Sequence, residues 1–353
     1  MAGDSTGKKT PTIAIDAMGG DFGPSVTVPG ALQAARDCGC KLLFVGKADE
    51  IDRELKKQNT SGLSFDIVHA SEVAEMQDKP SDVLRRKKDS SIQVACRLVK
   101  DGQADGLVSP GHSGATVACA MFIIGRIPGV DRLGLATMLP SEIEGHPTVM
   151  LDVGANVDSH PHHLFQFGLM GSALAKTVLG RDDPKIGILS IGEEEGKGNT
   201  LVKDAYELLK MANNLNFVGN AEGRDIFTGE LDVIVCDGFV GNVALKVIEG
   251  ACRLFADFLK QEFRRTIFTK LAGLMSIPVL RAFRRRFDPR NYNGATLLGL
   301  KGIVVKSHGS ADIFSYRQAI HRAVEEVRGG VLDKITARMD ERLRAQSNGT
   351  VSE

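Results

Sequence analysis

The sequence lacks the features that would assign it to nucleic acid or to the interior of a membrane. Lys plus Arg and Asp plus Glu number 44 each in 353 residues, so there is no net charge to attract nucleic acid. There is no N-terminal apolar segment of the signal-peptide type and no run of 18 apolar residues. We therefore expect a cytoplasmic protein that does not span a membrane and does not bind nucleic acid.

Residues arranged for metal binding are also scarce. The six cysteines show neither C-x-x-C nor paired metal-ligand spacing, and most lie in apolar contexts, so we expect them to be reduced and structural. The histidines of His160–His163 lack a completing carboxylate or cysteine, and Pro161 suits a first helical turn. Glu193–Glu195 could hold a divalent cation, although exposed loop charge is the preferred interpretation. We predict no metal and no cofactor.

Two common catalytic motifs are missing. Ser113 lies in Gly-His-Ser-Gly-Ala, which breaks the G-x-S-x-G pattern of a serine nucleophile. Lys197 lies between two glycines, which leave space for its ammonium to reach a ligand. The segment lacks G-x-x-x-x-G-K-[ST], so it is not a nucleotide-binding loop. His112 remains open as a base, a phosphate donor or a capping residue.

Short apolar runs that alternate with helical periodicity predict an α/β fold with a mostly parallel sheet. We expect one domain over residues 11–340, preceded by a disordered segment 1–10 and followed by a polar tail 341–353. The expected strands are 12–16, 41–46, 65–69, 106–109, 185–190, 231–236 and 302–306, with further strands within 149–158 and 217–225.

Small or polar residues follow six expected strands, at Asp16, Ser109, Asp152, Lys197, Asn242 and Ser307. Because carboxyl ends of parallel strands share an edge, we expect one site there. The central stretch is 235–246, in which Gly238 and Gly241 are expected to leave helix amides uncovered and Asn242 to occupy the N-cap position. An ordinary strand-to-helix turn with an asparagine cap is the alternative.

Two regions are locally basic. Arg85, Arg86, Lys87 and Lys88 form either a solvated helix face or a docking surface for an acidic protein. Residues 263–287 contain seven cations and no acid, with apolar residues at helical spacing and a break at 273–278. They predict an amphipathic helical hairpin within 262–290. A core-packed pair and a dimer interface are alternatives, but contact with an anionic bilayer is favoured.

Several motifs in order resemble the phosphate acyltransferase family of bacterial phospholipid synthesis. They are Ile15–Asp21, Arg85–Ser91, Asp152–Asp158, Glu222–Ile226, Asp237–Asn242, Tyr292–Ala295 and Lys306–Gly309. The resemblance implies a three-layer α/β/α sandwich like that of isocitrate and isopropylmalate dehydrogenases. It also implies a homodimer attached peripherally to the inner face of the cell membrane. The chain departs from the family's usual Asn-Thr at His112-Ser113 and from an Arg-Pro-Ala-Leu-like segment at 126–130.

The resemblance implies transfer of a long-chain fatty acyl group from acyl carrier protein to inorganic phosphate. The acyl phosphate formed would pass to a downstream glycerol-phosphate acyltransferase. The family's catalytic pair falls on Lys197 and Asn242. Phosphate would be held by Ser307, His308 and Gly309, with Ser113 and Gly114 as weaker candidates. The active-site wall would comprise Asp16, Gly19, Gly20, Asp21, Asn156, Asp237 and Gly241. Membrane contacts would be Leu271, Leu274, Met275, Leu280, Phe283, Arg284 and Arg285.

Three other functions compete with this one. An NAD-dependent β-decarboxylating dehydrogenase would share the fold, but neither a cluster of Mg²⁺-binding aspartates nor an arginine clamp for carboxylates can be assembled from the sequence. A phosphotransacetylase that uses coenzyme A is closer in chemistry, and the basic hairpin argues against it. A non-catalytic membrane-bound scaffold for lipid enzymes is the third alternative.

Overall fold

The computed structural model describes residues 10–347, apart from the side chains of 284–287, 289 and 345–347. Its frame is one 11-stranded sheet in the order β3-β2-β1-β4-β11-β10-β5-β6-β9-β7-β8. The strands are β1 (Thr12–Asp16), β2 (Lys41–Gly46), β3 (Phe65–His69), β4 (Gly106–Ser109), β5 (Gly134–Leu139), β6 (Thr148–Leu151), β7 (Lys185–Leu189), β8 (Asn216–Ala221), β9 (Val233–Val235), β10 (Ala295–Leu298) and β11 (Ile303–Lys306).

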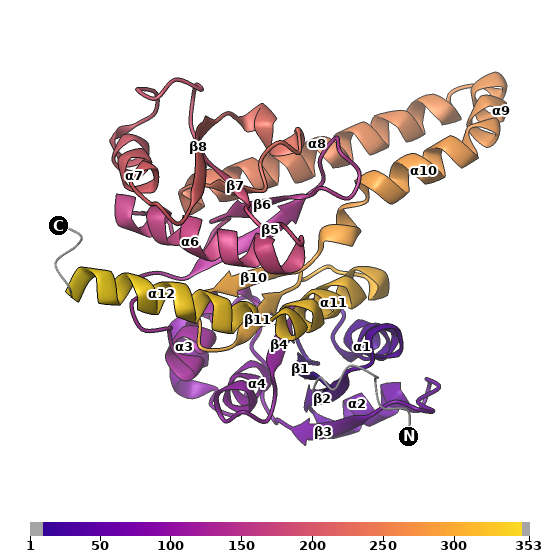
Figure 1. Ribbon diagram of the computed structural model, residues 1–353. Coiled ribbons are helices and arrows are strands. Elements are labelled where there is room, and N and C mark those ends of the chain that lie inside the picture. Colours follow the sequence, from indigo (N-terminus) through magenta and orange to yellow (C-terminus); the bar gives the residue numbers. More distant parts are fainter. Residues whose placement is uncertain (1–9, 348–353) are drawn as a thin grey trace.

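Helices cover both faces of this sheet (Figure 1). The α-helices are α1 (Pro24–Cys38), α2 (Ala48–Leu55), α3 (Pro80–Arg86), α4 (Ser91–Lys100), α5 (Ser113–Cys119), α6 (Pro161–Val178), α7 (Thr200–Lys210), α8 (Gly238–Arg264), α9 (Ile267–Met275), α10 (Ile277–Phe287), α11 (Ile313–Gly329) and α12 (Val331–Ser347). Short helical turns are η1 (Ala120–Ile124), η2 (Gly223–Phe227) and η3 (Pro289–Tyr292).

Alternation along β1 shows why the protein has three layers. Ile13 and Ile15 join the core cluster that contains Val28 of α1, whereas Ala14 joins a second cluster with Ile92 of α4. Successive side chains of a strand point to opposite faces, so each face of the sheet buries its own helical layer. The predicted three-layer α/β/α fold is confirmed.

The sheet reverses direction in its middle. β1, β2, β3, β4 and β11 are mutually parallel, and so are β6, β7, β8 and β9. Between these halves, β10 is antiparallel to both β11 and β5, and β5 is antiparallel to β6. Three reversals in succession make the two halves run in opposite directions. The prediction that all six strand ends meet at one edge is therefore wrong.

A helical arm protrudes from the body (Figure 1). Its outgoing leg is α8, α9 lies at the tip, and α10 returns to the body. The predicted break within 273–278 contains the boundary between α9 and α10, but the predicted bounds 262–290 omit most of α8, which forms the first leg. Phe263 at the end of α8 packs where a side chain on Gly273 of α9 would lie, 2.9 Å from its ring. Within residues 10–347, no helix combines the length and hydrophobicity needed to cross a membrane.

The C-terminal helix α12 crosses the domain boundary predicted at residue 340 and continues to Ser347. Its residues Val331, Ile335 and Met339 are buried in the main core, so this helix belongs to the folded body. The predicted N-terminal disordered segment falls largely on residues 1–9, and the end of the predicted tail falls on 348–353. Both stretches lie outside the described residues.

Candidate functional site

Lys197 and Asn242 leave the sheet at the same edge. Lys197 lies in the loop after β7, and Asn242 lies on the helix that follows β9. These strands are parallel neighbours with Ile188 beside Val235, so the loops beyond them start side by side. Both side chains are exposed. We call this end of β6, β7, β8 and β9 the Asn242 edge.

The Asp152 carboxylate organises the turn after β6 at the Asn242 edge. It accepts hydrogen bonds from the amides of Leu135, Gly154, Ala155 and Asn156 at 2.9 to 3.0 Å and from the Asn156 side-chain amide at 2.7 Å. Burial raises the pKa of this carboxyl, and these hydrogen bonds act against that rise. Asn156 also donates to the Leu133 carbonyl, so this predicted wall residue is engaged in holding the turn.

The start of α8 differs from the prediction. Asp237, not Asn242, is the N-cap, and its carboxylate accepts from the amides of Phe239 at 2.9 Å and Val240 at 3.4 Å. Asn242 lies one turn into the helix, where its side chain passes over Gly154. The expectation of uncovered amides fails because the side chain of Asp237 already occupies them.

The two glycines of this motif serve close packing. A Cβ on Gly241 would lie 1.9 Å from the Asp152 carbonyl oxygen, and one on Gly238 would lie 2.2 Å from the Asn156 carbonyl oxygen. The glycines therefore let α8 sit directly on the Asp152 turn. This contact fixes where Asn242 emerges.

Three buried polar atoms at the Asn242 edge have no hydrogen-bond partner among the described residues: Ser190 Oγ, Asn220 Oδ1 and Asp237 Oδ2. They belong to the ends of β7, β8 and β9, which are adjacent in the sheet. Buried polar groups are normally paired with protein or ordered water, so this edge has spare hydrogen-bonding capacity beside Lys197. Sequence reasoning placed Asp237 in the active-site wall but missed Ser190 and Asn220, because the order of their strands in the sheet was unknown.

The carboxyl ends of β1, β4 and β11 lie at the opposite end of the sheet, which we call the Ser307 edge. This edge centres on a buried carboxylate. Asp16 accepts hydrogen bonds from Ser91 Oγ and Ser109 Oγ, each at 2.6 Å. Burial raises the pKa of Asp16, and these two hydroxyls oppose the rise. Asp16 is 2% exposed, and its hydrogen bonds link the end of β1 to Ser91 at the start of α4 and to Ser109 at the end of β4.

Glycine loops meet above Asp16. A Cβ on Gly19 would lie 2.7 Å from the Gly111 amide nitrogen, and one on Gly20, which has φ of 79°, would lie 2.9 Å from the Gly309 carbonyl oxygen. The Asp21 amide donates to that same carbonyl at 2.9 Å. The loops after β1, β4 and β11 are thus brought together, as predicted for Gly19, Gly20, Asp21 and Gly309.

The predicted phosphate ligands differ in accessibility. Ser307 is fully buried, and its hydroxyl accepts from the side-chain amide of Asn293 at 2.8 Å. His308 is exposed and lies 2.9 Å from Ser310 Oγ through its Nδ1. Ser113 is exposed at the first turn of α5, next to Gly114. The imidazole of His112 accepts from the Ala115 amide at 3.0 Å, which favours capping among its alternatives.

Lys306 is a functional candidate that sequence reasoning overlooked because it ends an apolar strand. Burial lowers the pKa of its ammonium to about 8, while the neighbouring carboxylates of Asp16 and Asp21 act to raise it. The Nζ atom donates to the Ser307 carbonyl. Lys306 therefore brings a cation to the Ser307 edge, within the electrostatic influence of Asp16 and Asp21.

Charged residues of α8 act on the Ser307 edge. The helix starts at the Asn242 edge, and the charges of Lys246 and Glu249 on its third and fourth turns influence His308. Partial burial of the imidazole ring lowers the pKa of His308, Glu249 raises it, and Lys246 lowers it. Asn242 lies one turn before Lys246, so one helix carries a predicted catalytic residue and approaches a predicted phosphate ligand.

The basic run divides into outward and inward members. Arg85, Arg86 and Lys88 are exposed on or just after α3. Lys87 instead donates to the Val73 carbonyl at 2.9 Å and pairs with Asp78 at 2.5 Å. The docking prediction can therefore concern three of the four cations. Across the part of the chain that the structure describes, no three His, Cys, Asp or Glu residues are grouped as a metal would require.

The predicted membrane contacts are largely exposed. Leu271, Leu274, Met275 and Phe283 are 57 to 77% exposed, whereas Leu280 is half-buried. Phe268 at the tip, which was not among the predicted contacts, is 83% exposed. The side chains of Arg284 and Arg285 lie outside the described residues.

The fold is similar to that of solved phosphotransacylases. A phosphotransacetylase from Streptococcus pyogenes superposes with a TM-score of 0.63 at 20% identity, covering 90% of this chain and 94% of that one. A 4-hydroxythreonine-4-phosphate dehydrogenase from Burkholderia phymatum gives 0.50 at 16% identity, with 90% and 98% covered. These similarities establish an α/β class shared by acyl-transfer and dehydrogenase enzymes.

The family follows from sequence comparison. Residues 11–334 match the model of the family described as fatty acid synthesis protein, and the chain belongs to this family. A relative named phosphate acyltransferase from Nitratidesulfovibrio vulgaris strain DP4 is 58% identical over 88% of this chain and 90% of its own length. One from Halorhodospira halophila is 49% identical over 95% and 98%. The predicted family and acyltransferase class are confirmed.

Proposed function

We propose that this protein transfers a long-chain fatty acyl group from acyl carrier protein to inorganic phosphate, giving acyl phosphate for phospholipid synthesis. The observation that carries the proposal is the similarity, at 49 to 58% identity over most of the chain, to relatives named phosphate acyltransferase. The family description supplies the connection to fatty acids. The carrier-bound donor and the role in phospholipid synthesis go beyond those names.

The proposed reaction is direct attack of phosphate on a thioester. A phosphate oxygen forms a bond to the thioester carbonyl carbon, the carbon–sulfur bond breaks, and the carrier's thiolate leaves. Lys197 neutralises the developing oxyanion and Asn242 donates a hydrogen bond to it. A thiolate is a good leaving group, so the reaction needs little acid catalysis.

The proposed phosphate site comprises His308 and the Gly309 loop, with Lys306 as the nearby cation. α8 supports this arrangement because it carries Asn242 and approaches His308. A covalent cysteine intermediate is not needed. Burial raises the pKa of the Cys236 thiol well above its ordinary value, which disfavours the reactive thiolate at the position nearest Asp237.

The proposed partners follow from surfaces around these edges. Arg85, Arg86 and Lys88 would bind an acidic carrier protein, since α3 packs beside α5 at the Ser307 edge. α8 exposes apolar residues along its length, and these support the proposed homodimer: Phe239, Val240, Val243, Val247, Leu254, Phe255, Phe258 and Leu259. The arm would attach the protein peripherally to the inner face of the membrane, where a glycerol-phosphate acyltransferase could take the product.

The reaction can be tested with purified protein, inorganic phosphate and acyl carrier protein charged with palmitate. We expect acyl phosphate to form together with free carrier thiol, measured by mass spectrometry and thiol titration. Palmitoyl-coenzyme A in place of the carrier tests the phosphotransacetylase alternative. Faster turnover with coenzyme A would identify the wrong donor, and no product from either donor would favour the scaffold.

Membrane attachment can be tested by flotation with anionic vesicles. Leu274→Glu combined with Phe283→Glu should abolish flotation, because exposed apolar side chains on a basic helix insert into the interface. Val218→Glu, a change at an exposed valine of β8, is the control and should float as the unchanged protein does. Undiminished flotation of the double variant would assign these residues to packing.

A further inference from the structure

An apolar hollow beside the Ser307 edge has no role in the mechanism above. Its volume is about 350 Å³, and it is a shallow hollow that is largely open to the surface. Its lining consists of Phe22, Val26, Asp312, Ile313 and Phe314. Phe22 is 55% exposed, so a large apolar side chain faces the opening without being covered by the chain itself.

One end of the hollow joins the proposed phosphate site. Phe22 directly follows Asp21, whose amide donates to the Gly309 carbonyl at 2.9 Å. Asp312 lies three residues after Gly309 and caps α11 by accepting from the Ser315 amide at 2.8 Å. The same two loops therefore form the phosphate-side surface and the walls of the hollow.

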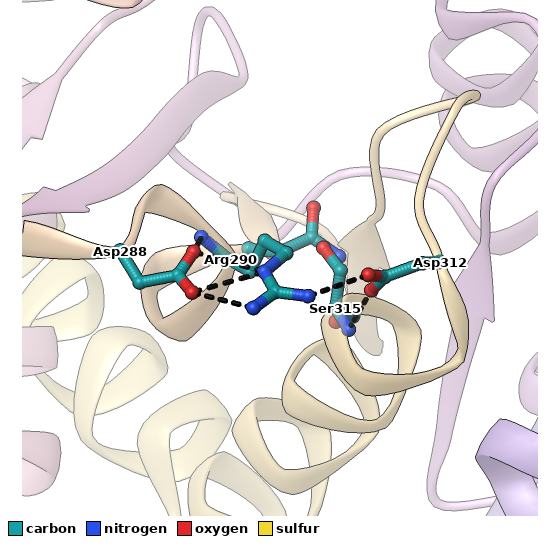
Figure 2. Close-up of polar contacts among 5 residues, drawn as sticks. Asp288, Arg290, Asp312 and Ser315 are labelled. Atoms are coloured by element: carbon teal, nitrogen blue, oxygen red, sulfur yellow. Dashed lines mark hydrogen bonds and ion pairs between the residues drawn. The ribbon is translucent and has the colours of Figure 1, made fainter. Parts of the chain in front are cut away.

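The other end lies at the base of the protruding arm. Figure 2 shows Arg290 between Asp288 and Asp312, with its guanidinium 2.6 Å and 2.7 Å from their carboxylates. The same guanidinium lies 5.1 Å from the centre of the Phe314 ring. Arg290 thus links the segment that follows α10 to Asp312 and Phe314, two residues that line the hollow. The base of the arm therefore lies next to the hollow.

We propose that this hollow binds the hydrocarbon chain of the fatty acyl substrate. The chain's carbonyl end would lie toward the Gly309 loop, and its methyl end would lie toward the base of the arm. This inference rests on the proposed function, and the occupant follows from continuity with the proposed phosphate site and from the family's connection to fatty acids. A hydrocarbon chain needs no hydrogen-bond partners, and each methylene buried here would improve binding about fourfold.

The test is to fill the hollow and compare donors of different length. In the chain of 353 residues, Val26→Trp and Ile313→Trp should each lower kcat/KM for hexadecanoyl carrier protein at least about tenfold, while kcat/KM for butanoyl carrier protein stays within about twofold. Val218→Trp, which enlarges an exposed valine on β8 away from the hollow, should leave both values unchanged. Equal losses for both donors, or no loss for the long donor, would overturn the proposal.

Direct binding separates this inference from the proposed reaction. A fluorescent sixteen-carbon fatty acid should bind the unchanged protein without phosphate or carrier, and Val26→Trp should weaken that binding at least about tenfold. If no donor yields acyl phosphate but Val26→Trp still binds the fatty acid more weakly, the proposed reaction is wrong and the proposed hydrocarbon site is supported. Undiminished binding of the fatty acid by Val26→Trp would overturn the site. If melting temperatures show that the tryptophan variants unfold, Val26→Leu and Ile313→Phe replace them. These smaller changes should also lower kcat/KM for the long donor more than for the short donor, by a smaller factor.

Discussion

The two edges of the sheet are built from different chemistry. The Ser307 edge is closed: its carboxylate and hydroxyl groups hydrogen-bond to one another beneath tightly packed glycine loops. The Asn242 edge is open, with Lys197 and Asn242 exposed and three buried polar atoms unpartnered among the described residues. Under the proposed function, the Ser307 edge would supply a preformed phosphate site, and the Asn242 edge would complete its hydrogen bonds when a substrate arrives.

The largest effect is expected at the Asn242 edge. Asn242→Ala and Lys197→Ala should each lower kcat for acyl phosphate formation by about 10² to 10³, because each would remove one of the contacts proposed to stabilise the oxyanion. Their melting temperatures should stay unchanged, since both side chains are exposed. Lys203→Ala, on an exposed lysine of α7, is the matched control. Near-normal turnover in either test variant would remove that residue from the catalytic pair.

A glycine pair on α8 tests the packing that positions Asn242. Gly241→Ala should destabilise the protein by about 3 kcal/mol, because its methyl group would overlap the Asp152 carbonyl oxygen. Gly250→Ala on the same helix meets nothing within 4 Å and should be neutral or stabilising by up to about 1 kcal/mol. Denaturant unfolding measures both changes. Equal stability of the two variants would contradict the close contact between α8 and the Asp152 turn.

Lys306 gives the Ser307 edge a distinctive pH dependence. Burial lowers the pKa of its ammonium from 10.5 to about 8, so between these values the unfolded chain binds the proton and the folded chain does not. The contribution of Lys306 to stability should therefore rise with pH across this window, by about 2 to 3 kcal/mol. Lys306→Met should remove that rise, as followed by denaturant unfolding from pH 7 to 10.5. An identical pH profile would show that the ammonium is well solvated.

The smallest effect is expected from the basic run near the Ser307 edge. Reversing Arg85, Arg86 and Lys88 to Glu should raise KM for acyl carrier protein about tenfold at low salt, since exposed charge pairs contribute about 0.2 to 1 kcal/mol each. The increase should shrink as salt is added. Reversing Lys41, Lys56 and Lys57, also exposed or half-buried cations, is the control. Unchanged KM at low salt would move the carrier to another surface.

Much of the fold could be predicted from local pattern. The expected strands 41–46 and 65–69 coincide with β2 and β3, because these are compact apolar or alternating runs between polar turns. The two strands that were not predicted, β5 and β10, are those that reverse the sheet. Their sequences, Gly-Leu-Ala-Thr-Met-Leu and Ala-Thr-Leu-Leu, contain few β-branched residues and give a weak strand signal.

The arrangement of the candidate site was not predictable from the sequence. A strand pattern carries no record of direction, so Asp16 and Asp152 were expected at one edge although they lie at opposite ends of the sheet. Side-chain partners were equally hidden. Asp237 is a residue type that often caps helices, but the two glycines after it suggested that the helix amides were exposed. Lys87 resembles its basic neighbours in the sequence, although its ammonium forms an ion pair with Asp78. Such pairings depend on tertiary contacts that local spacing does not encode.

The length of α8 has a mechanical consequence. Its 27 residues form a rod about 40 Å long, with Asn242 near one end and the outer arm at the other. A rod of this kind transmits rotation, so anchoring its far end to a surface would restrict the orientations open to Asn242. Turnover and attachment would then be linked through one helix, without any change in the residues that touch the reacting atoms.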